Sequence, residues 1–289
     1  MRPGEGAKTL HTVERIHRKL LEWEMDRSSF VVGIGGGIVC DIAGFAASTY
    51  MRGVRFGFVP STLLAQADAA IGGKNGVNVG GIKNIAGVFR QPEFVLADFA
   101  ILATLPRRER LCGFAEIMKH ALIADGGLFE RLEGEAEALL ALDPGVLHRA
   151  LADSIRIKSA FVAADENESG ERRKLNFGHT LGHAVEKETG IRHGEAIAIG
   201  MAAAGRISAG RGMIPESDAE RITALLSVSG LPVRIPVSPR RLIGAMKRDK
   251  KRRGDLVHLV LLSAIGRAEG VDLGYDELEG MIDDLCQHR

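Results

Sequence analysis

The first hundred residues combine one amphipathic stretch with short apolar runs. Residues 9–25 place apolar side chains, beginning with Leu10 and Val13, at helical spacing, which predicts a helix with one apolar face. Three later runs are rich in branched and aromatic residues and stop at glycine, proline or aspartate, as strands do. The predicted strands are residues 30–34, 55–59 and 94–97. Strands that alternate with helices or loops are typical of a parallel α/β sheet.

The character of the chain changes at Pro106, after which helical periodicity dominates. Only residues 256–262 return to a β-rich pattern. We therefore predict an α/β domain over residues 1–105 and a mostly α-helical domain over residues 106–289. The helices predicted in the second domain are residues 107–124, 128–141, 145–164, 174–189, 194–211, 216–229 and 239–249.

Composition and charge narrow the class of protein. The 289 residues are 45% hydrophobic and 26% charged, as in folded globular proteins. No apolar run approaches the roughly 20 residues that cross a bilayer, and the N-terminus lacks the apolar segment of a secretory signal. A formal net charge of +1 gives no general attraction for nucleic acid. We expect a cytoplasmic protein that acts without nucleic acid or membrane, and its three widely spaced cysteines indicate no disulfides.

Three histidines lie close together in the second predicted domain. His179 and His183 are four residues apart, so a helix would present both on one face. A helix stop at Gly190 could turn the chain so that His193 approaches them. The pair does not have the glutamate of the HExxH motif of zinc proteases. The cluster indicates a metal site with two or three nitrogen ligands; ordinary core or surface histidines are the alternative.

A carboxylate would complete such a ligand set. Glu116 lies in the apolar segment 113–119, where burying an unpaired carboxylate is costly. We therefore consider Glu116 a candidate ligand. The alternative is a surface ion pair between Glu116 and Lys119, three residues further on.

Glycine-rich segments offer two further candidate sites. Residues 33–41 run from the end of a predicted strand into a predicted helix. They are rich in glycine but do not match the GxGxxG motif. Such a turn can bring backbone N–H groups to a pyrophosphate, and a plain tight turn is the alternative. Residues 68–84 set lysines and asparagines among glycines, which suits phosphate or polyol oxygens, with a generic surface loop as the alternative. The segment 171–174 places a guanidinium near the histidines, where a substrate carboxylate could meet it, whereas the basic run 247–253 is by itself typical of a solvated loop.

The chain carries, in this order, the segments GGGIVCDIAGFAASTYMRGVRF, VPSTLLAQADAAIGGK, GIKN, QPEFVLAD, TLPRRE, GFAEIMKH, LNFGHTLGHA, RHGEA and RDKK. Together these segments resemble the 3-dehydroquinate synthases and, more broadly, the sugar phosphate cyclases. The resemblance implies that an N-terminal Rossmann-like α/β domain binds NAD and that a helical C-terminal domain binds a divalent metal, zinc in the first place and cobalt as an alternative. It implies Glu116, His179 and His193 as metal ligands and makes His183 a contact of the substrate phosphate.

The resemblance implies roles for further residues. Lys158 and Arg172 would hold a substrate carboxylate, and Arg52 would reach the phosphate from the neighbouring subunit of a homodimer. The implied catalytic residues are Asp68, Lys74, Lys119 and His183. The implied substrate contacts are Arg52, Lys74, Asn84, Lys158, Arg172, Asn176, His183 and Lys250. The implied NAD contacts are Glu5, Lys8, Gly36, Gly37, Asp41, Ser61, Thr62, Asp68, Lys74 and Lys83.

The implied reaction converts 3-deoxy-D-arabino-heptulosonate 7-phosphate to 3-dehydroquinate and phosphate, a step of the shikimate pathway. Another sugar phosphate cyclase would share the NAD and metal sites and is the first alternative. An iron-type or glycerol dehydrogenase would share the architecture, but the GGK and LNFGHTLGHA segments do not suit it. A non-catalytic remnant of such an enzyme is the alternative from a different class.

The sequence departs from the family pattern in three places. Asn75 stands where the family usually has threonine after GGK, and Ser61 replaces the first threonine of VPTTLL. Family members also carry further strands before the PGExxK segment that Pro3 to Lys8 resembles. We therefore expect an NAD domain shortened at its N-terminus, with reduced affinity for NAD.

Overall fold

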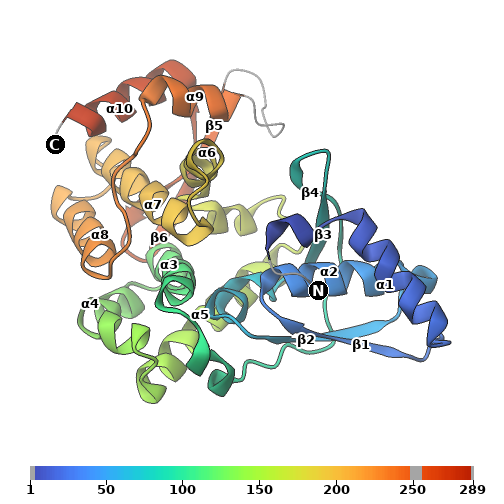
Figure 1. Ribbon diagram of the computed structural model, residues 1–289. Helices are drawn as coiled ribbons and strands as arrows, with labels where there is room; N and C mark the ends of the chain where they lie inside the picture. The colour runs from blue at the N-terminus through green and yellow to red at the C-terminus, as the bar shows by residue number, and fades with distance from the viewer. Residues whose placement is uncertain (1–3, 248–255, 288–289) are drawn as a thin grey trace. The chain divides into compact units, whose positions relative to one another are not determined.

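The computed structural model describes residues 4–247 and 256–287 (Figure 1). The chain divides into two compact units, one made of Met1–Gly113 with Lys158–Asn167 and the other of Phe114–Ile157 with Glu168–Arg289. Helices α3 and α5 each have residues in both units, and the division predicted between residues 105 and 106 stays a prediction. No helix of the described part of the chain is long and apolar enough to span a membrane.

Helices outnumber strands in the part of the chain that the structure describes. The α-helices are α1 (Leu10–Glu22), α2 (Gly37–Thr49), α3 (Arg107–Ala124), α4 (Gly126–Leu140), α5 (Pro144–Ala164), α6 (His179–Thr189), α7 (His193–Gly210), α8 (Glu216–Val228), α9 (Pro239–Lys247) and α10 (Tyr275–Gln287). The strands are β1 (Phe30–Gly35), β2 (Arg55–Pro60), β3 (Lys74–Val79), β4 (Ile82–Phe89), β5 (Leu256–Ala264) and β6 (Arg267–Gly274). Shorter helical turns are η1 (Glu5–Ala7), η2 (Tyr50–Arg52), the π-helical η3 (Ala65–Ala69), η4 (Phe99–Thr104) and η5 (Glu171–Asn176).

In the first unit, helix α2 packs between two pairs of strands (Figure 1). The parallel pair β1–β2 contributes Phe56 and Phe58 to a buried cluster with Cys40 of α2. On its other side, α2 buries Ile42 and other apolar residues against the antiparallel pair β3–β4. Thr9 caps α1 by accepting a hydrogen bond from the Thr12 N–H at 3.2 Å. The predicted N-terminal helix is thus confirmed, and the parallel pair β1–β2 confirms the predicted parallel α/β pairing.

One predicted strand of the first unit is wrong. Residues 94–97 do not form a strand, because only Val95 makes an isolated parallel bridge, to Phe58, before the Asp98 side chain caps η4. The generic surface loop considered as the alternative for residues 68–84 is also not found, because Lys74–Val79 and Ile82–Phe89 pair as the β3–β4 hairpin. Its glycines allow the strands to meet: a Cβ on Gly76 would lie 2.8 Å from the Ala86 carbonyl oxygen.

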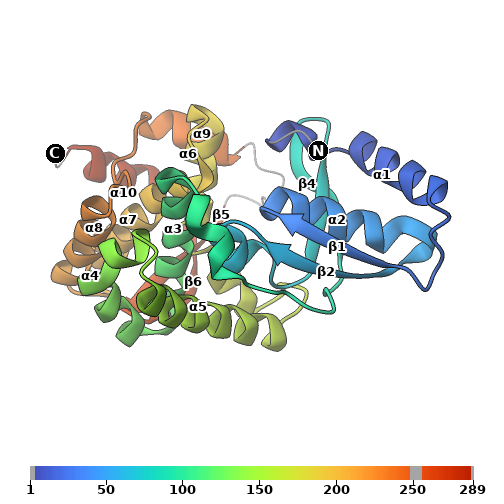
Figure 2. The same ribbon diagram turned by 60° about the horizontal axis from the view of Figure 1, so that its bottom comes forward.

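In the second unit, helix α7 is surrounded by other elements (Figures 1 and 2). Helices α6, α8 and α10 and strand β5 all contact it, and most of its residues are buried. Helix α7 packs tightly against the residue that precedes α6, because a Cβ on Gly200 would lie 1.9 Å from the Gly178 carbonyl oxygen. The predicted helix 174–189 is wrong at its start, because Gly178, at φ +74°, separates η5 from α6.

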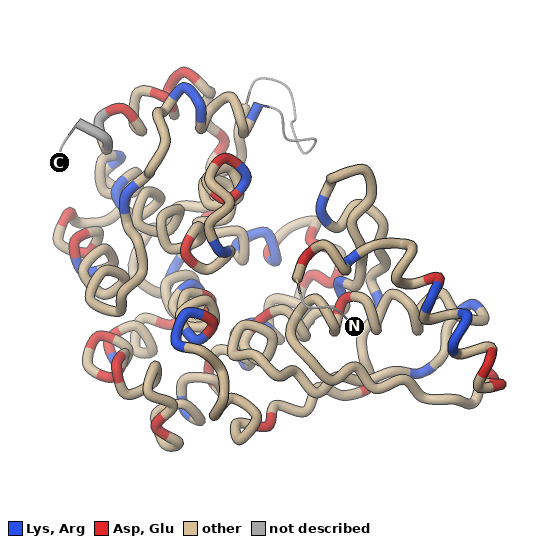
Figure 3. The backbone as a smooth tube through the Cα atoms, in the orientation of Figure 1, with Lys and Arg blue, Asp and Glu red and all other residues tan. Residues whose placement is uncertain are grey.

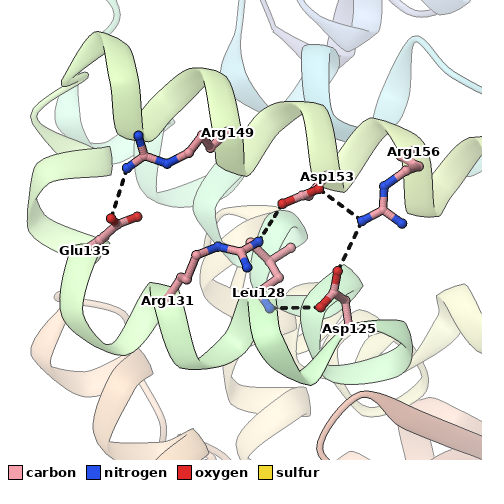
Figure 4. Close-up of polar contacts among 7 residues, drawn as sticks. All are labelled: Asp125, Leu128, Arg131, Glu135, Arg149, Asp153 and Arg156. Atoms are coloured by element: carbon pink, nitrogen blue, oxygen red, sulfur yellow. Dashed lines mark hydrogen bonds and ion pairs between the residues drawn. The ribbon is translucent and has the colours of Figure 1, made fainter.

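Charged side chains of both signs are interspersed along each unit, without a long single-sign stretch among the described residues (Figure 3). Helices α4 and α5 carry a continuous set of ion pairs between them (Figure 4). Asp153 accepts from Arg131 at 2.5 Å and from Arg156 at 3.0 Å. Asp125 accepts from Arg156 at 3.2 Å and also caps α4 by accepting from the Leu128 N–H at 2.9 Å. The cap fixes where α4 begins, and the ion pairs join its surface to that of α5.

Candidate metal and cofactor sites

Three helices of the second unit bring a carboxylate and two imidazoles together. Glu116 lies on α3, His179 is the first residue of α6 and His193 is the first residue of α7. The Oε1 atom of Glu116 lies 3.7 Å from His179 Nε2 and 3.4 Å from His193 Nε2. We call Glu116, His179 and His193 the metal cluster.

The Nδ1 atom of each histidine in the metal cluster lies within hydrogen-bond distance of an oxygen atom. His179 Nδ1 lies 3.0 Å from the Phe177 carbonyl oxygen, and His193 Nδ1 lies 3.2 Å from Glu186 Oε2. Because these oxygens only accept hydrogen bonds, Nδ1 carries a proton in each ring. Nε2 is therefore the nitrogen left to bind an ion in each ring, as in metal-ligating histidines, and that of His193 can do so once it has lost its own proton.

The metal cluster fits a zinc-type ion in composition and in spacing. Two imidazole nitrogens and one carboxylate are a donor set of catalytic zinc sites, and bonds of about 2.0–2.2 Å in a tetrahedron put ligand atoms about 3.3–3.6 Å apart. The separations of 3.4 and 3.7 Å come close to that range. The residues present can therefore hold such an ion.

The charge state of the metal cluster depends on burial and on Lys119. Glu116 is completely buried, and Lys119 Nζ lies 2.6 Å from its Oε2; a pair exposed at the surface, the alternative considered from the sequence, is therefore wrong. Burial would raise the pKa of Glu116, but the Lys119 ammonium and the two histidines hold it well below its usual range. The carboxylate is thus ionised, as a ligand must be.

The two histidines of the metal cluster differ in protonation. Burial, followed by the Lys119 ammonium, lowers the pKa of His179 well below its usual value, so its ring is neutral. Burial would also lower the pKa of His193, but Glu116 and Glu186 raise it to about 9. Without a metal, His193 is therefore protonated at neutral pH, and binding an ion there must release that proton.

His183 is close to the metal cluster but differs from its histidines in exposure. Its ring centroid lies 5.2 Å from that of His179 and 5.7 Å from that of His193, and one nitrogen from each of the three rings falls within 4.8 Å of the others. The His183 side chain is exposed, whereas the other two are half-buried. Its assignment to the substrate phosphate stays a prediction.

The predicted anion contacts of the second unit are only partly described. Arg172 is buried, with 1% of its surface exposed. The side-chain amide of Asn176 donates to Glu168 Oε1 at 2.9 Å. Lys250 lies outside the described residues.

Several residues expected at the NAD site converge in the first unit. The buried Lys8 ammonium contacts the carboxylate of Asp41 and the side-chain oxygen of Asn84. Burial raises the pKa of Asp41, against the opposing effect of Lys8. Asn78 joins the group, because its amide donates to Glu5 Oε1 at 2.7 Å and its oxygen accepts from the Asn84 N–H at 2.9 Å. The structure thus brings together Glu5, Lys8, Asp41 and Asn84.

The glycine turn before α2 is shaped by close packing. Gly36 caps α2 without a side-chain hydrogen bond, and a Cβ there would lie 3.1 Å from the Thr62 side chain. A Cβ on Gly37 would lie 3.0 Å from that of Ala69. Ser61 is tied to the same turn, because its N–H donates to the Gly35 carbonyl at 2.8 Å. The turn satisfies a packing need and also starts a helix, so both interpretations of the glycines remain.

Asp68 and Lys158 meet within the first unit. Lys158 Nζ donates to the Asp68 carbonyl oxygen at 3.0 Å and forms an ion pair with the Asp68 carboxylate. The remaining predicted residues of this unit lie near the surface. Lys74 begins β3, Lys83 lies on β4, and Arg52 closes η2 with a left-handed backbone at φ +65°.

Sequence reasoning missed two residues that lie next to the metal cluster. Glu186, which contacts His193, follows His179 at i+7 and His183 at i+3 on α6, so helical spacing could have identified it. His120 follows Glu116 at i+4 and is completely buried beside Ser154, with Nδ1 and Oγ 2.7 Å apart. Burial, and to a lesser extent Lys119, lowers the pKa of His120 to about 3.

Two family models and two curated relatives that match this chain share the same description. A family model described as 3-dehydroquinate synthase N-terminal matches residues 1–112, and one described as 3-dehydroquinate synthase C-terminal matches residues 113–252. A 3-dehydroquinate synthase of Halorhodospira halophila is 49% identical over 269 residues, covering 92% of this chain and 76% of the relative. One of Pyrobaculum neutrophilum is 42% identical, covering 96% of this chain and 82% of the relative.

Solved structures of sugar phosphate cyclases share the fold. A 2-epi-5-epi-valiolone synthase of Streptomyces hygroscopicus, with NAD+ and Zn2+ bound, is 31% identical with a TM-score of 0.92, covering 100% of this chain and 82% of that one. A 2-deoxy-scyllo-inosose synthase, complexed with carbaglucose-6-phosphate, NAD+ and Co2+, is 30% identical with a TM-score of 0.89, covering 98% and 82%. The family models and the curated relatives agree on one assignment: this chain belongs to the 3-dehydroquinate synthase family.

Proposed function

We propose that this chain converts 3-deoxy-D-arabino-heptulosonate 7-phosphate to 3-dehydroquinate with release of phosphate. The observation that carries the proposal is the metal cluster, in which Glu116, His179 and His193 converge from three helices at 3.4 and 3.7 Å. Curated 3-dehydroquinate synthases at 42–49% identity over most of the chain support the same reaction.

The proposal includes two cofactors. Glu116, His179 and His193 would hold a divalent metal, zinc in the first place, and Glu5, Lys8 and Asp41 would contact NAD. When bound, the metal would polarise substrate hydroxyls, and NAD would accept a hydride and later return it. Solved cyclases with NAD+ and either Zn2+ or Co2+ bound support both assignments.

Residues of the second unit would bind and orient the substrate. Lys119, whose ammonium is fixed by Glu116 at 2.6 Å, would donate to a substrate hydroxyl and favour its loss of a proton. Asn176 and His183 would hold the phosphate before it is eliminated, and Arg172 would pair with the substrate carboxylate. Ring closure then depends on holding the opened chain in a reactive pose.

In the first unit, Lys158 forms an ion pair with the Asp68 carboxylate. A substrate carboxylate at Lys158 would compete with Asp68 for the same ammonium. Three further residues would lie where the nicotinamide ring meets the substrate: Lys74, Lys83 and Asn84. The proposal also includes a cytoplasmic homodimer in which Arg52 reaches the phosphate of the neighbouring subunit.

The experiment that tests the proposal measures phosphate released from 3-deoxy-D-arabino-heptulosonate 7-phosphate by protein supplied with zinc and NAD. We expect many turnovers per NAD, because the hydride returns to the substrate, and loss of turnover after chelator treatment. Folded, zinc-loaded protein that releases no phosphate in the presence of NAD would contradict the proposal.

A second candidate is another sugar phosphate cyclase, which the TM-scores of 0.92 and 0.89 favour. The two candidates differ in whether the substrate carries a carboxylate, the group that the resemblance assigns to Lys158 and Arg172. We expect phosphate release from the carboxylated substrate and none from glucose 6-phosphate, which has no carboxylate. The reverse preference would establish the second candidate.

A further inference from the structure

A buried histidine lies beside the metal cluster without a role in the proposed reaction. His120 follows Glu116 by four residues on α3, and residues at this spacing share a helix face. One ring nitrogen of His120 falls within 4.8 Å of a Glu116 carboxylate oxygen. Both side chains are completely buried, so each affects the other in a medium of low dielectric constant.

Ser154 of α5 forms a hydrogen bond with the Nδ1 atom of His120. Its Oγ lies 2.7 Å from His120 Nδ1, and Ser154 is also completely buried. His120 Nε2 has no hydrogen-bond partner among the described residues. A buried polar atom without a hydrogen-bond partner is costly. We therefore consider the Glu116 carboxylate as the partner of Nε2.

The hydroxyl of Ser154 decides which nitrogen carries the proton. A serine hydroxyl can donate or accept, and a neutral imidazole has one donor and one acceptor nitrogen. If Nδ1 donated to Ser154, the Nε2 lone pair would remain buried without a donor. If Ser154 donates to Nδ1, the proton lies on Nε2 and can serve the carboxylate, which is the favourable arrangement.

We propose that Ser154 and His120 are positioning residues for the metal ligand Glu116. Ser154 fixes the tautomer of His120, and the N–H that this tautomer places on the ring interacts with the Glu116 carboxylate. Outer partners of this kind fix the orientation of a ligating carboxylate and tune metal affinity. The inference rests on the metal site of the proposed function.

The test compares zinc affinity and the visible spectrum of cobalt-loaded protein. His120→Phe keeps a ring but removes the donor, and we expect it to weaken zinc binding about 10- to 100-fold and to shift the cobalt bands. Ser154→Ala removes one hydroxyl and should weaken zinc binding about 2- to 10-fold. His120→Gln retains a side-chain N–H and should recover part of the affinity that the phenylalanine variant loses.

Ser229→Ala is the matched control. Ser229 is also buried, and its hydroxyl donates to the Leu225 carbonyl at 2.7 Å, at the end of α8. We expect this variant to keep the zinc affinity and cobalt spectrum of the unmodified protein.

Each outcome separates this inference from the proposed function. Unmodified protein that binds no zinc would overturn both. Zinc binding by the unmodified protein, with the same affinity and spectrum in His120→Phe and Ser154→Ala, would overturn the positioning role alone. If His120→Phe does not fold, Ser154→Ala decides the matter, and an unchanged spectrum in that variant overturns the inference.

Discussion

Cys40 shows how strongly burial changes a side chain at the scale of a single residue. Its thiol is 1% exposed in the core of the first unit, and burial, with Asp41 adding to the effect, raises its pKa to about 12. Only the thiolate is nucleophilic, and a thiol of that pKa is ionised to about one part in ten thousand at pH 8. We therefore expect no alkylation of Cys40 by iodoacetamide in the folded protein at pH 8. Mass spectrometry would check this, with urea-unfolded protein as the control; rapid modification of the folded protein would contradict it.

Asn75, which departs from the family pattern, has a structural explanation. Its buried side-chain amide donates to the Gly73 carbonyl at 3.0 Å and to the Arg90 carbonyl at 2.8 Å. Asn75 thus ties the turn before Lys74 to the end of β4. Threonine, the usual residue of the family, has one donor and could satisfy only one of these carbonyls.

The loss of stability on substitution of Asn75 should depend on how many hydrogen-bond donors the new side chain keeps. Asn75→Asp places a carboxylate against two carbonyl oxygens and should lower the free energy of unfolding by about 2–4 kcal/mol. Asn75→Thr keeps one donor and should cost about 1 kcal/mol. Urea denaturation measures both changes. An aspartate variant as stable as the unmodified protein would show that the amide hydrogen bonds contribute nothing.

At the scale of elements, the crossing of α6 and α7 brings the two histidines of the metal cluster together. It depends on a glycine, because a Cβ on Gly200 would lie 1.9 Å from the Gly178 carbonyl oxygen. Gly200→Ala should therefore destabilise the protein by about 2–4 kcal/mol and reduce its zinc content. Gly210→Ala in the same helix is the control, since a Cβ there meets nothing within 4 Å. Thermal unfolding measures the difference, and equal stability of the two variants would rule out the steric explanation.

The start of α4 offers a second test at this scale. Asp125 caps the helix through the Leu128 N–H at 2.9 Å and also pairs with the exposed Arg156 at 3.2 Å. Asp125→Ala loses the cap and should cost about 1 kcal/mol. Asp125→Asn keeps a capping oxygen and loses only an exposed ion pair, so it should cost about 0.5 kcal/mol or less. Urea denaturation of both variants would contradict the cap assignment if they were equally destabilised.

Sequence periodicity was a good guide to the helices and a poorer one to the strands. The predicted helix 107–124 coincides with α3 (Arg107–Ala124), although residues 111–123 are all buried and their apolar positions do not mark one face. The β3–β4 hairpin escaped prediction because its glycines and asparagines have low strand propensity. Those residues are required by close packing of the strands and by hydrogen bonds such as that from Asn78 to Glu5, which no local pattern reveals.

At the scale of the whole molecule, the candidate sites draw on segments that are far apart in the sequence. The metal cluster joins Glu116 to His193, and the group around Lys8 joins Glu5 to Asn84. Motif resemblance could indicate these residues because their types are ordered along the chain. It could not indicate His120 or Ser154, whose contact follows from the packing of α3 and α5, whereas the helical spacing of Glu186 on α6 could have indicated that residue.

The central claim is that Glu116, His179 and His193 hold the metal and that His183 does not. The most direct measurement is the zinc content per chain, after dialysis, of the unmodified protein and of four variants: Glu116→Gln, His179→Asn, His193→Asn and His183→Asn. We predict one zinc per chain in the unmodified protein and in His183→Asn, and little or none in the other three. Full zinc content in any of those three, or loss of zinc in His183→Asn alone, would contradict the assignment.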